Sequence, residues 1–160
     1  MSQKVFLVGL PGAGKTTLGI QLADHLGIPF VDLDLEIEKH AKQSIRSIFS
    51  EKSEAYFRRL ENRKLNDVIK ELTTFVMATG GGTPCFFDNM EVMNAEGKTI
   101  FINTSIDKIK RRLQQDTVRP LMQTKTLEDL LEKREKQYLQ ADKTVTTKQG
   151  LFELFKKNSS

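Results

Sequence analysis

The sequence predicts an α/β fold, a three-layer sandwich in which helices cover both faces of a five-stranded parallel sheet. Short apolar runs alternate with longer amphipathic stretches along the chain, an order typical of parallel sheets. The central runs are apolar at every position, as expected of strands that are buried on both faces. The 160 residues contain no repeat and no low-complexity segment, so we expect one domain that spans residues 1–160.

The expected strands and helices follow one another in regular order. The strands span Lys4–Val8, Pro29–Asp32, Thr74–Ala78, Thr99–Asn103 and Lys143–Thr146. The first helix has a leucine stripe and ends at Gly27, and the later helices span Ser53–Leu72, Phe87–Asn94, Ser105–Gln114, Thr126–Ala141 and Leu151–Lys156. Ligands of such sheets bind beyond the carboxyl ends of the strands, so we expect the chemistry there.

The composition limits the class of protein and its partners. Hydrophobic residues make up 38% and charged residues 29% of the chain, as in soluble globular proteins. The net charge of +4 is spread along the sequence, which argues against a nucleic-acid partner. No apolar run approaches the roughly 20 residues that span a bilayer, and the N-terminus resembles no signal peptide. With Cys85 as its single cysteine, the chain is expected in the reducing cytoplasm, with no membrane partner.

Residues 9–16 form a phosphate-binding loop. They read Gly-Leu-Pro-Gly-Ala-Gly-Lys-Thr and lie between an expected strand and an expected helix, which the motif G-x-x-x-x-G-K-[ST] requires. The motif predicts that Lys15 contacts the β- and γ-phosphates of a nucleotide and that the Thr16 hydroxyl binds Mg²⁺. We assign the nucleotide contacts to Gly12, Ala13, Gly14, Lys15, Thr16 and Thr17. A glycine-rich turn with a chance lysine is the alternative.

Two aspartates follow the second expected strand. Asp32 and Asp34 are two residues apart, so on an extended segment both face the same side. One carboxylate can hold Mg²⁺ through water, and the other can accept a proton from a substrate hydroxyl during phosphoryl transfer. An acidic surface turn with a helix-capping aspartate is the alternative.

Three charged residues occupy positions where a helix should be apolar. Glu61 falls within the apolar stripe of the helix from Ser53, with Arg58 on its flank, and Arg134 falls within the stripe of the helix from Thr126. A buried charge needs a partner. The three residues therefore form either a structural ion-pair network or a pocket whose arginines bind an anionic substrate group.

Two further segments interrupt the regular pattern. Residues 113–125 are polar, lie between two helices and contain Arg119, which favours a lid over a plain surface connection. Gly80, Gly81 and Gly82 end the third strand, where they allow either close approach of a ligand or a flexible turn.

Taken together, these motifs resemble the shikimate kinase family, a nucleoside-monophosphate-kinase-type branch of the P-loop NTPases with a mobile lid. The resemblance runs from Lys4 to about Asp142. The segments that carry it are Gly9–Thr16, Asp32-x-Asp34, Ser44-Ile45-x-x-Ile48-Phe49, Glu54-x-x-Phe57-Arg58-x-x-Glu61, Thr79–Gly82, Arg119-Pro120-Leu121 and Arg134-x-x-x-Tyr138-x-x-Ala141-Asp142. Ser53 replaces the usual glycine before Glu54, and Leu33 replaces a small polar residue, but neither position carries chemistry.

The resemblance implies a function and a set of site residues. It implies ATP-dependent phosphorylation of the 3-hydroxyl of shikimate, with ATP and Mg²⁺, by a monomer whose acceptor region covers about residues 32–62. Shikimate would contact Asp34, Arg58, Gly80, Gly81, Gly82 and Arg134, with Glu61 in support; Asp32 and Thr16 would hold Mg²⁺; Arg112 would stack on adenine; and Lys15, Asp34 and Arg119 would be catalytic.

Two alternatives to this function stay open at this point. A related small-molecule kinase of the gluconate type would share the phosphate-binding loop and the lid, but it would not need two arginines that face one carboxylate. A nucleotide-dependent switch protein would share the loop alone, and it would not need a separate acceptor pocket.

Overall fold

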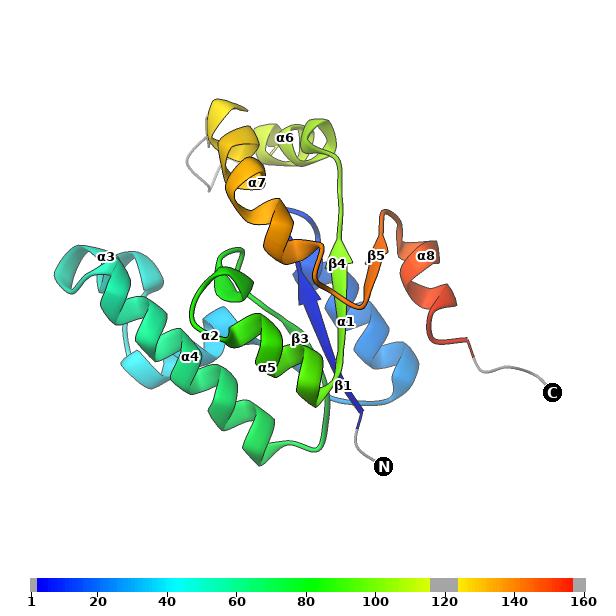
Figure 1. Ribbon diagram of the computed structural model, residues 1–160, viewed down its shortest axis with the longest axis horizontal. Helices are drawn as coiled ribbons and strands as arrows, with labels where there is room; N and C mark the ends of the chain where they lie inside the picture. Colours follow the sequence, from blue (N-terminus) through cyan, green and yellow to red (C-terminus); the bar gives the residue numbers. More distant parts are fainter. Residues whose placement is uncertain (1–2, 116–123, 157–160) are drawn as a thin grey trace.

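A five-stranded parallel sheet forms the centre of the molecule, as predicted. The computed structural model describes residues 3–115 and 124–156 (Figure 1). The strands are β1 (Gln3–Val8), β2 (Phe30–Asp32), β3 (Thr74–Ala78), β4 (Lys98–Ile102) and β5 (Lys143–Val145). They pair in the order β2-β3-β1-β4-β5, and every pairing is parallel. The expected strand boundaries agree with these to within two residues.

Helices connect the strands, and two of the α-helices are absent from the prediction. The helices are α1 (Lys15–Leu26), α2 (Leu33–Ala41), α3 (Ile45–Glu51), α4 (Glu54–Glu71), the 3₁₀ turn η1 (Thr83–Cys85), α5 (Asn89–Glu96), α6 (Ile106–Gln115), α7 (Thr124–Tyr138) and α8 (Lys148–Glu153). The missed helices α2 and α3 have 9 and 7 residues, too few for a periodic pattern. The side chains of Asp32 and Ser44 cap their N-termini.

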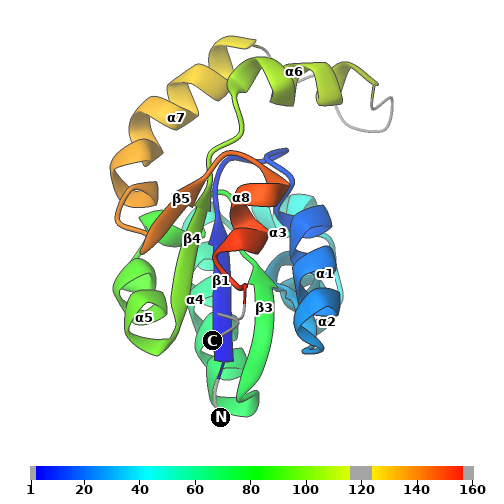
Figure 2. The same ribbon diagram turned by 90° about the vertical axis from the view of Figure 1, so that its right-hand side faces the viewer.

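The hydrophobic core surrounds the central strands of the sheet. Helices α1 and α5 lie on opposite faces of the sheet (Figure 2). Phe6, Phe75 and Phe101, from β1, β3 and β4, are almost completely buried, and the rings of Phe6 and Phe75 meet edge to face at 5.4 Å. Continuous burial of these strands explains why they are apolar at every position. Among the described helices, none is long and apolar enough to cross a membrane.

The carboxyl ends of the strands meet α6 and α7. Both helices lie beyond this edge of the sheet (Figures 1 and 2). Helix α6 continues to Gln115 and α7 begins at Thr124, so the predicted loop 113–125 is helical at both of its ends. The Leu113 side chain packs into the core, which explains why the helix continues through it. Residues 116–123, which include Arg119, lie outside the described residues.

Candidate active site

The phosphate-binding loop leads from the end of β1 to the start of α1. Its glycines Gly9, Gly12 and Gly14 have φ angles of 151°, 84° and 102°, which favour glycine strongly over other residues. The Thr104 hydroxyl, just beyond β4, donates a hydrogen bond of 2.6 Å to the Ala13 carbonyl and fixes the far side of the loop. The loop is therefore shaped by its own sequence and held in place by a neighbouring strand end.

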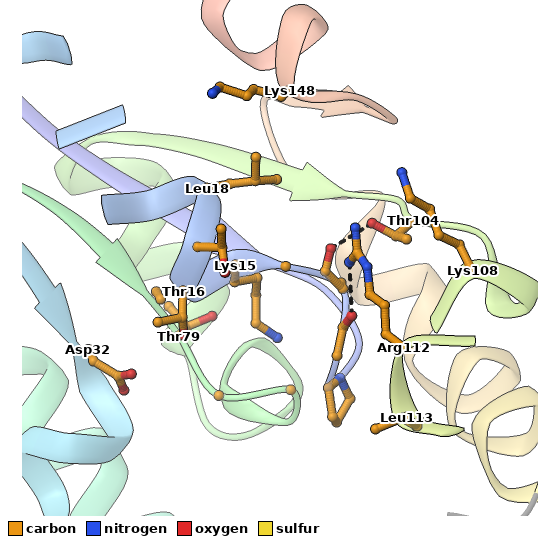
Figure 3. A pocket seen from close by; sticks show the side chains of 18 of the residues that line it. Lys15, Thr16, Leu18, Asp32, Thr79, Thr104, Lys108, Arg112, Leu113 and Lys148 are labelled. Carbon is orange, nitrogen blue, oxygen red and sulfur yellow. Dashed lines mark hydrogen bonds between the residues drawn. The ribbon is translucent and has the colours of Figure 1, made fainter. Parts of the chain in front are cut away.

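A cavity of about 690 Å³ opens over this loop (Figure 3). All six loop residues predicted to contact the nucleotide line it: Gly12, Ala13, Gly14, Lys15, Thr16 and Thr17. Arg112 reaches in from α6 and donates through Nη1 to the Gly12 carbonyl at 3.2 Å. Lys108 and Lys148 also line the cavity, from α6 and α8. Cations thus surround the loop on several sides, as a triphosphate requires.

Lys15 is buried and bonded to its own loop. Its Nζ donates to the carbonyl oxygens of Gly9 and of Leu10. Burial lowers the pKa of Lys15 to about 8, while Asp34 acts in the opposite direction and Arg134 reinforces the shift. Because this pKa stays above 7, most Lys15 side chains carry a positive charge at neutral pH and can neutralise a phosphate.

The two aspartates do not lie on one extended segment, so that prediction was wrong. Strand β2 ends at Asp32, whose side chain caps α2 by accepting the Leu35 N–H at 3.2 Å. Asp34 lies in the first turn of that helix. The alternative of a helix-capping aspartate therefore describes Asp32. Both aspartates nevertheless line the cavity, because the start of α2 faces it.

The environment of Asp34 favours its protonated form. Burial raises the pKa of Asp34 to about 6, and the negative charges of Asp32 and Glu61 act in the same direction. Lys15 acts in the opposite direction. A carboxylate with a pKa near the working pH suits proton transfer in either direction.

The three glycines after β3 lie close to the side chains that are predicted to bind the acceptor. A Cβ atom on Gly80 would lie 3.0 Å from Asp34 Oδ1, and one on Gly81 would lie 2.9 Å from Arg134 Nη1. A Cβ atom on Gly82 would lie 2.5 Å from Arg58 Nη2. Each glycine therefore lies against one predicted substrate-binding residue. Close approach explains these glycines, since none of the three has a positive φ angle.

Arg58 is held in place by a buried ion pair and an aromatic ring. Its Nη1 donates to Glu61 Oε1 at 3.0 Å, and Glu54 Oε1 lies 3.5 Å from its Nε. The Phe86 ring lies 4.1 Å from the guanidinium carbon. Burial raises the pKa of Glu61, whereas Arg58 and the Thr83 hydroxyl act in the opposite direction. The structural ion pair thus exists, and it orients the arginine of the proposed pocket.

Sequence reasoning missed two side chains that hold the glycine segment. The Thr83 hydroxyl accepts the Gly80 N–H at 2.9 Å, and the Tyr138 hydroxyl donates to the Gly81 carbonyl at 2.6 Å. Tyr138 belongs to a motif quoted above, but no role was predicted for it. Lys148 was missed as well, because the resemblance ends before it. Among the described residues, Arg58, Glu61, Gly82 and Arg134 lie beside the cavity over the phosphate-binding loop rather than in its wall.

Fold and site define a P-loop kinase: a phosphate-binding loop at the centre of the sheet lies next to a separate site for a phosphoryl acceptor. A family model described as shikimate kinase matches residues 11–157. The chain belongs to the shikimate kinase family.

Individual proteins agree with this assignment. A shikimate kinase of Bacteroides thetaiotaomicron is 45% identical over 146 residues, which are 86% of this chain and 83% of that protein. The crystal structure of a shikimate kinase from the same species matches with a TM-score of 0.90 at 38% identity, over 97% of this chain and 99% of that one. A shikimate kinase of Acinetobacter baumannii, solved with shikimate, matches with a TM-score of 0.87 at 33% identity, over 97% and 93%.

Proposed function

We propose that this chain transfers the γ-phosphoryl group of ATP to the 3-hydroxyl of shikimate, with the nucleotide over the phosphate-binding loop and shikimate beside Gly80–Gly82. The observation that carries the proposal is the convergence of Asp34, Arg134 and Arg58 on these three glycines. Two cations and a carboxylate match a substrate that has one carboxylate and several hydroxyl groups. Membership of the shikimate kinase family favours this acceptor over gluconate, and it favours an enzyme over a switch protein.

The carboxylate of shikimate is the proposed ligand of the two arginines. Arg58 Nε is buried and has no hydrogen-bond partner within the described part of the chain. Guanidinium groups bind carboxylates through paired hydrogen bonds, so a substrate carboxylate would complete the contacts of Arg58. The N–H groups of Gly81 and Gly82 have no protein acceptor among the described residues either, and they are further donors for the substrate. Glu61 supports the site through its ion pair with Arg58.

Catalysis in this proposal depends on positioning and charge neutralisation. Asp34 accepts the proton of the attacking hydroxyl, which its pKa of about 6 permits at neutral pH. Lys15 neutralises charge on the β- and γ-phosphates. Arg119, which lies outside the described residues, is proposed to reach the transferred phosphoryl group from the lid, and Arg112 is proposed to stack on adenine. The lid excludes water, which would otherwise accept the phosphoryl group.

The residues present fit Mg²⁺. Thr16 and Asp32 offer a hydroxyl and a carboxylate oxygen in the same cavity, and oxygen ligands are those that Mg²⁺ prefers. The described residues form no cluster of three or more His, Cys, Asp or Glu side chains, in keeping with an ion held partly by phosphates and water. When bound, Mg²⁺ neutralises phosphate charge. The monomeric state and the cytoplasmic location stay predictions, and chromatography with light scattering tests the first.

A coupled assay of ADP release tests the two halves of the site separately. Shikimate should raise ATP turnover by orders of magnitude over water, and gluconate should not. Arg134→Ala should weaken shikimate binding by roughly 2–4 kcal/mol, the cost of a lost charge-assisted contact, and should leave ATP affinity nearly unchanged. Lys15→Ala should abolish phosphoryl transfer. Lys133→Ala, on an exposed neighbour of Arg134 in α7, is the control.

Two results would contradict the proposal. Equal turnover with gluconate and shikimate would show that the acceptor is not specified by this site. An equal loss of ATP and shikimate affinity in Arg134→Ala would show that Arg134 does not belong to the acceptor half.

A further inference from the structure

We infer that Thr83 is a positioning residue for the acceptor half of the site. Its single hydroxyl fixes the Gly80 amide and the Glu61 carboxylate, and through Glu61 it fixes the guanidinium of Arg58. The inference rests on the proposed shikimate site, because it concerns how that site is held ready for its substrate.

The hydroxyl lies in the middle of a continuous line of hydrogen bonds. Thr83 is the first residue of η1 and is completely buried. Its Oγ1 lies 2.9 Å from the Gly80 nitrogen and 2.8 Å from Glu61 Oε2. The other oxygen of Glu61 accepts a hydrogen bond of 3.0 Å from Arg58 Nη1. The line therefore joins the end of β3 to two residues of α4.

The direction of each bond follows from the chemistry of the groups. A backbone N–H can only donate, so Oγ1 accepts from Gly80. The one hydroxyl proton is then available for Glu61, which accepts it as a carboxylate. Only a side chain that both donates and accepts at this point can hold the two groups at once. An aspartate here would place a second negative charge against Glu61, and a valine would offer neither function.

The backbone of Thr83 is itself held in place by side chains of two helices. The Asn89 side chain donates through Nδ2 to the Thr83 carbonyl at 2.9 Å, and Asn62 Nδ2 donates to Asn89 Oδ1 at 2.6 Å. Asn89 belongs to α5 and Asn62 to α4. The turn that carries the hydroxyl is thus held by two helices. The hydroxyl therefore has a fixed position, from which it orients Arg58 through Glu61.

Loss of the hydroxyl would remove the partner of the Gly80 amide and of one Glu61 oxygen, Oε2, while Glu61 Oε1 keeps its ion pair with Arg58. Glu61 has no exposed surface and Gly80 is buried, so both Glu61 Oε2 and the Gly80 amide would need a new partner. The Glu61 carboxylate could then rotate, and Arg58 would lose its orientation towards the substrate carboxylate. The effect should appear in the apparent affinity for the acceptor, because the nucleotide half of the site has its own supports.

Three threonine variants test this inference. Thr83→Val keeps the shape of the side chain and removes the hydroxyl, whereas Thr83→Ser keeps the hydroxyl. Thr104→Val makes the same chemical change at the buried threonine that holds Ala13 in the phosphate-binding loop. We expect Thr83→Val to raise the KM for shikimate at least about tenfold and that for ATP less than about threefold. Thr83→Ser should stay within about threefold of the parent on both, and Thr104→Val should raise chiefly the KM for ATP.

Each outcome decides between a positioning and a merely structural role. Three results together support the inference: Thr83→Ser keeps both KM values near those of the parent, Thr83→Val raises chiefly the KM for shikimate, and Thr104→Val raises chiefly the KM for ATP. Equal changes in both KM values for Thr83→Val, or no change, overturn it. If Thr83→Val fails to fold, Thr83→Ala compared with Thr83→Ser gives the same test. Arg134→Ala, assayed in parallel, separates the two proposals: if it leaves the KM for shikimate unchanged, the proposed acceptor site itself is wrong.

Discussion

Replacing Asp34 by asparagine should abolish activity and at the same time stabilise the unliganded protein. Burial raises the pKa of Asp34 from 3.8 to about 6, so its negative charge disfavours the folded state at neutral pH. Asparagine has nearly the shape of the protonated acid and carries no charge. The rise in pKa corresponds to about 3 kcal/mol, which is the upper limit of the gain in unfolding free energy expected for Asp34→Asn at pH 7.5.

The pH dependence of this gain has a definite sign. A carboxyl group whose pKa is higher in the folded state stabilises the fold below its unfolded pKa, and this contribution is lost as the pH rises through about 6. Asparagine does not titrate. The difference between Asp34→Asn and the parent protein should therefore shrink from about 3 kcal/mol at pH 7.5 to about 1 kcal/mol at pH 4.5.

Urea unfolding of both proteins at these two pH values measures the difference. Asp24→Asn, on an exposed side chain of α1, is the matched control and should change stability by less than about 0.5 kcal/mol. A loss of ADP release in Asp34→Asn would support the proposed role of Asp34 in catalysis. If Asp34→Asn were no more stable than the parent at pH 7.5, or if its gain were independent of pH, the argument from burial would be refuted.

Three further predictions follow from the site. The kcat/KM of the parent should fall about tenfold per pH unit below about pH 6, as Asp34 becomes protonated, and a flat profile down to pH 5 would exclude it as the base. Gly82→Ala should raise the KM for shikimate and not that for ATP, since its Cβ would lie 2.5 Å from Arg58 Nη2; an equal rise in both would indicate general misfolding. Arg119→Ala should lower kcat at least about a hundredfold in single-turnover and steady-state assays, and near-normal kcat would make the segment that contains Arg119 a plain connection.

The sequence predicted those features that leave a local pattern. Strands buried on both faces are apolar throughout, and the charges of Glu61 and Arg134 were conspicuous within apolar stripes, with Arg58 on the flank of the first stripe. Helices α2 and α3 left no such pattern because they are short, and Asp34 was misplaced because α2 begins directly after Asp32. The role of the Thr83 hydroxyl depends on a partner 22 residues away, and that of the Tyr138 hydroxyl on a partner 57 residues away. No local pattern reports such distant partners.

The bond between Tyr138 and Gly81 has a consequence for movement in this enzyme. Arg134 lies one helical turn before Tyr138 in α7. The side chain proposed to bind shikimate is therefore close to the hydrogen bond that links this helix to Gly81. The opposite end of α7 begins directly after residues 116–123, the part of the proposed lid outside the described residues. A rotation of α7 about the bond between Tyr138 and Gly81 would therefore move Arg134 less than the start of the helix, because Arg134 lies within one turn of that bond.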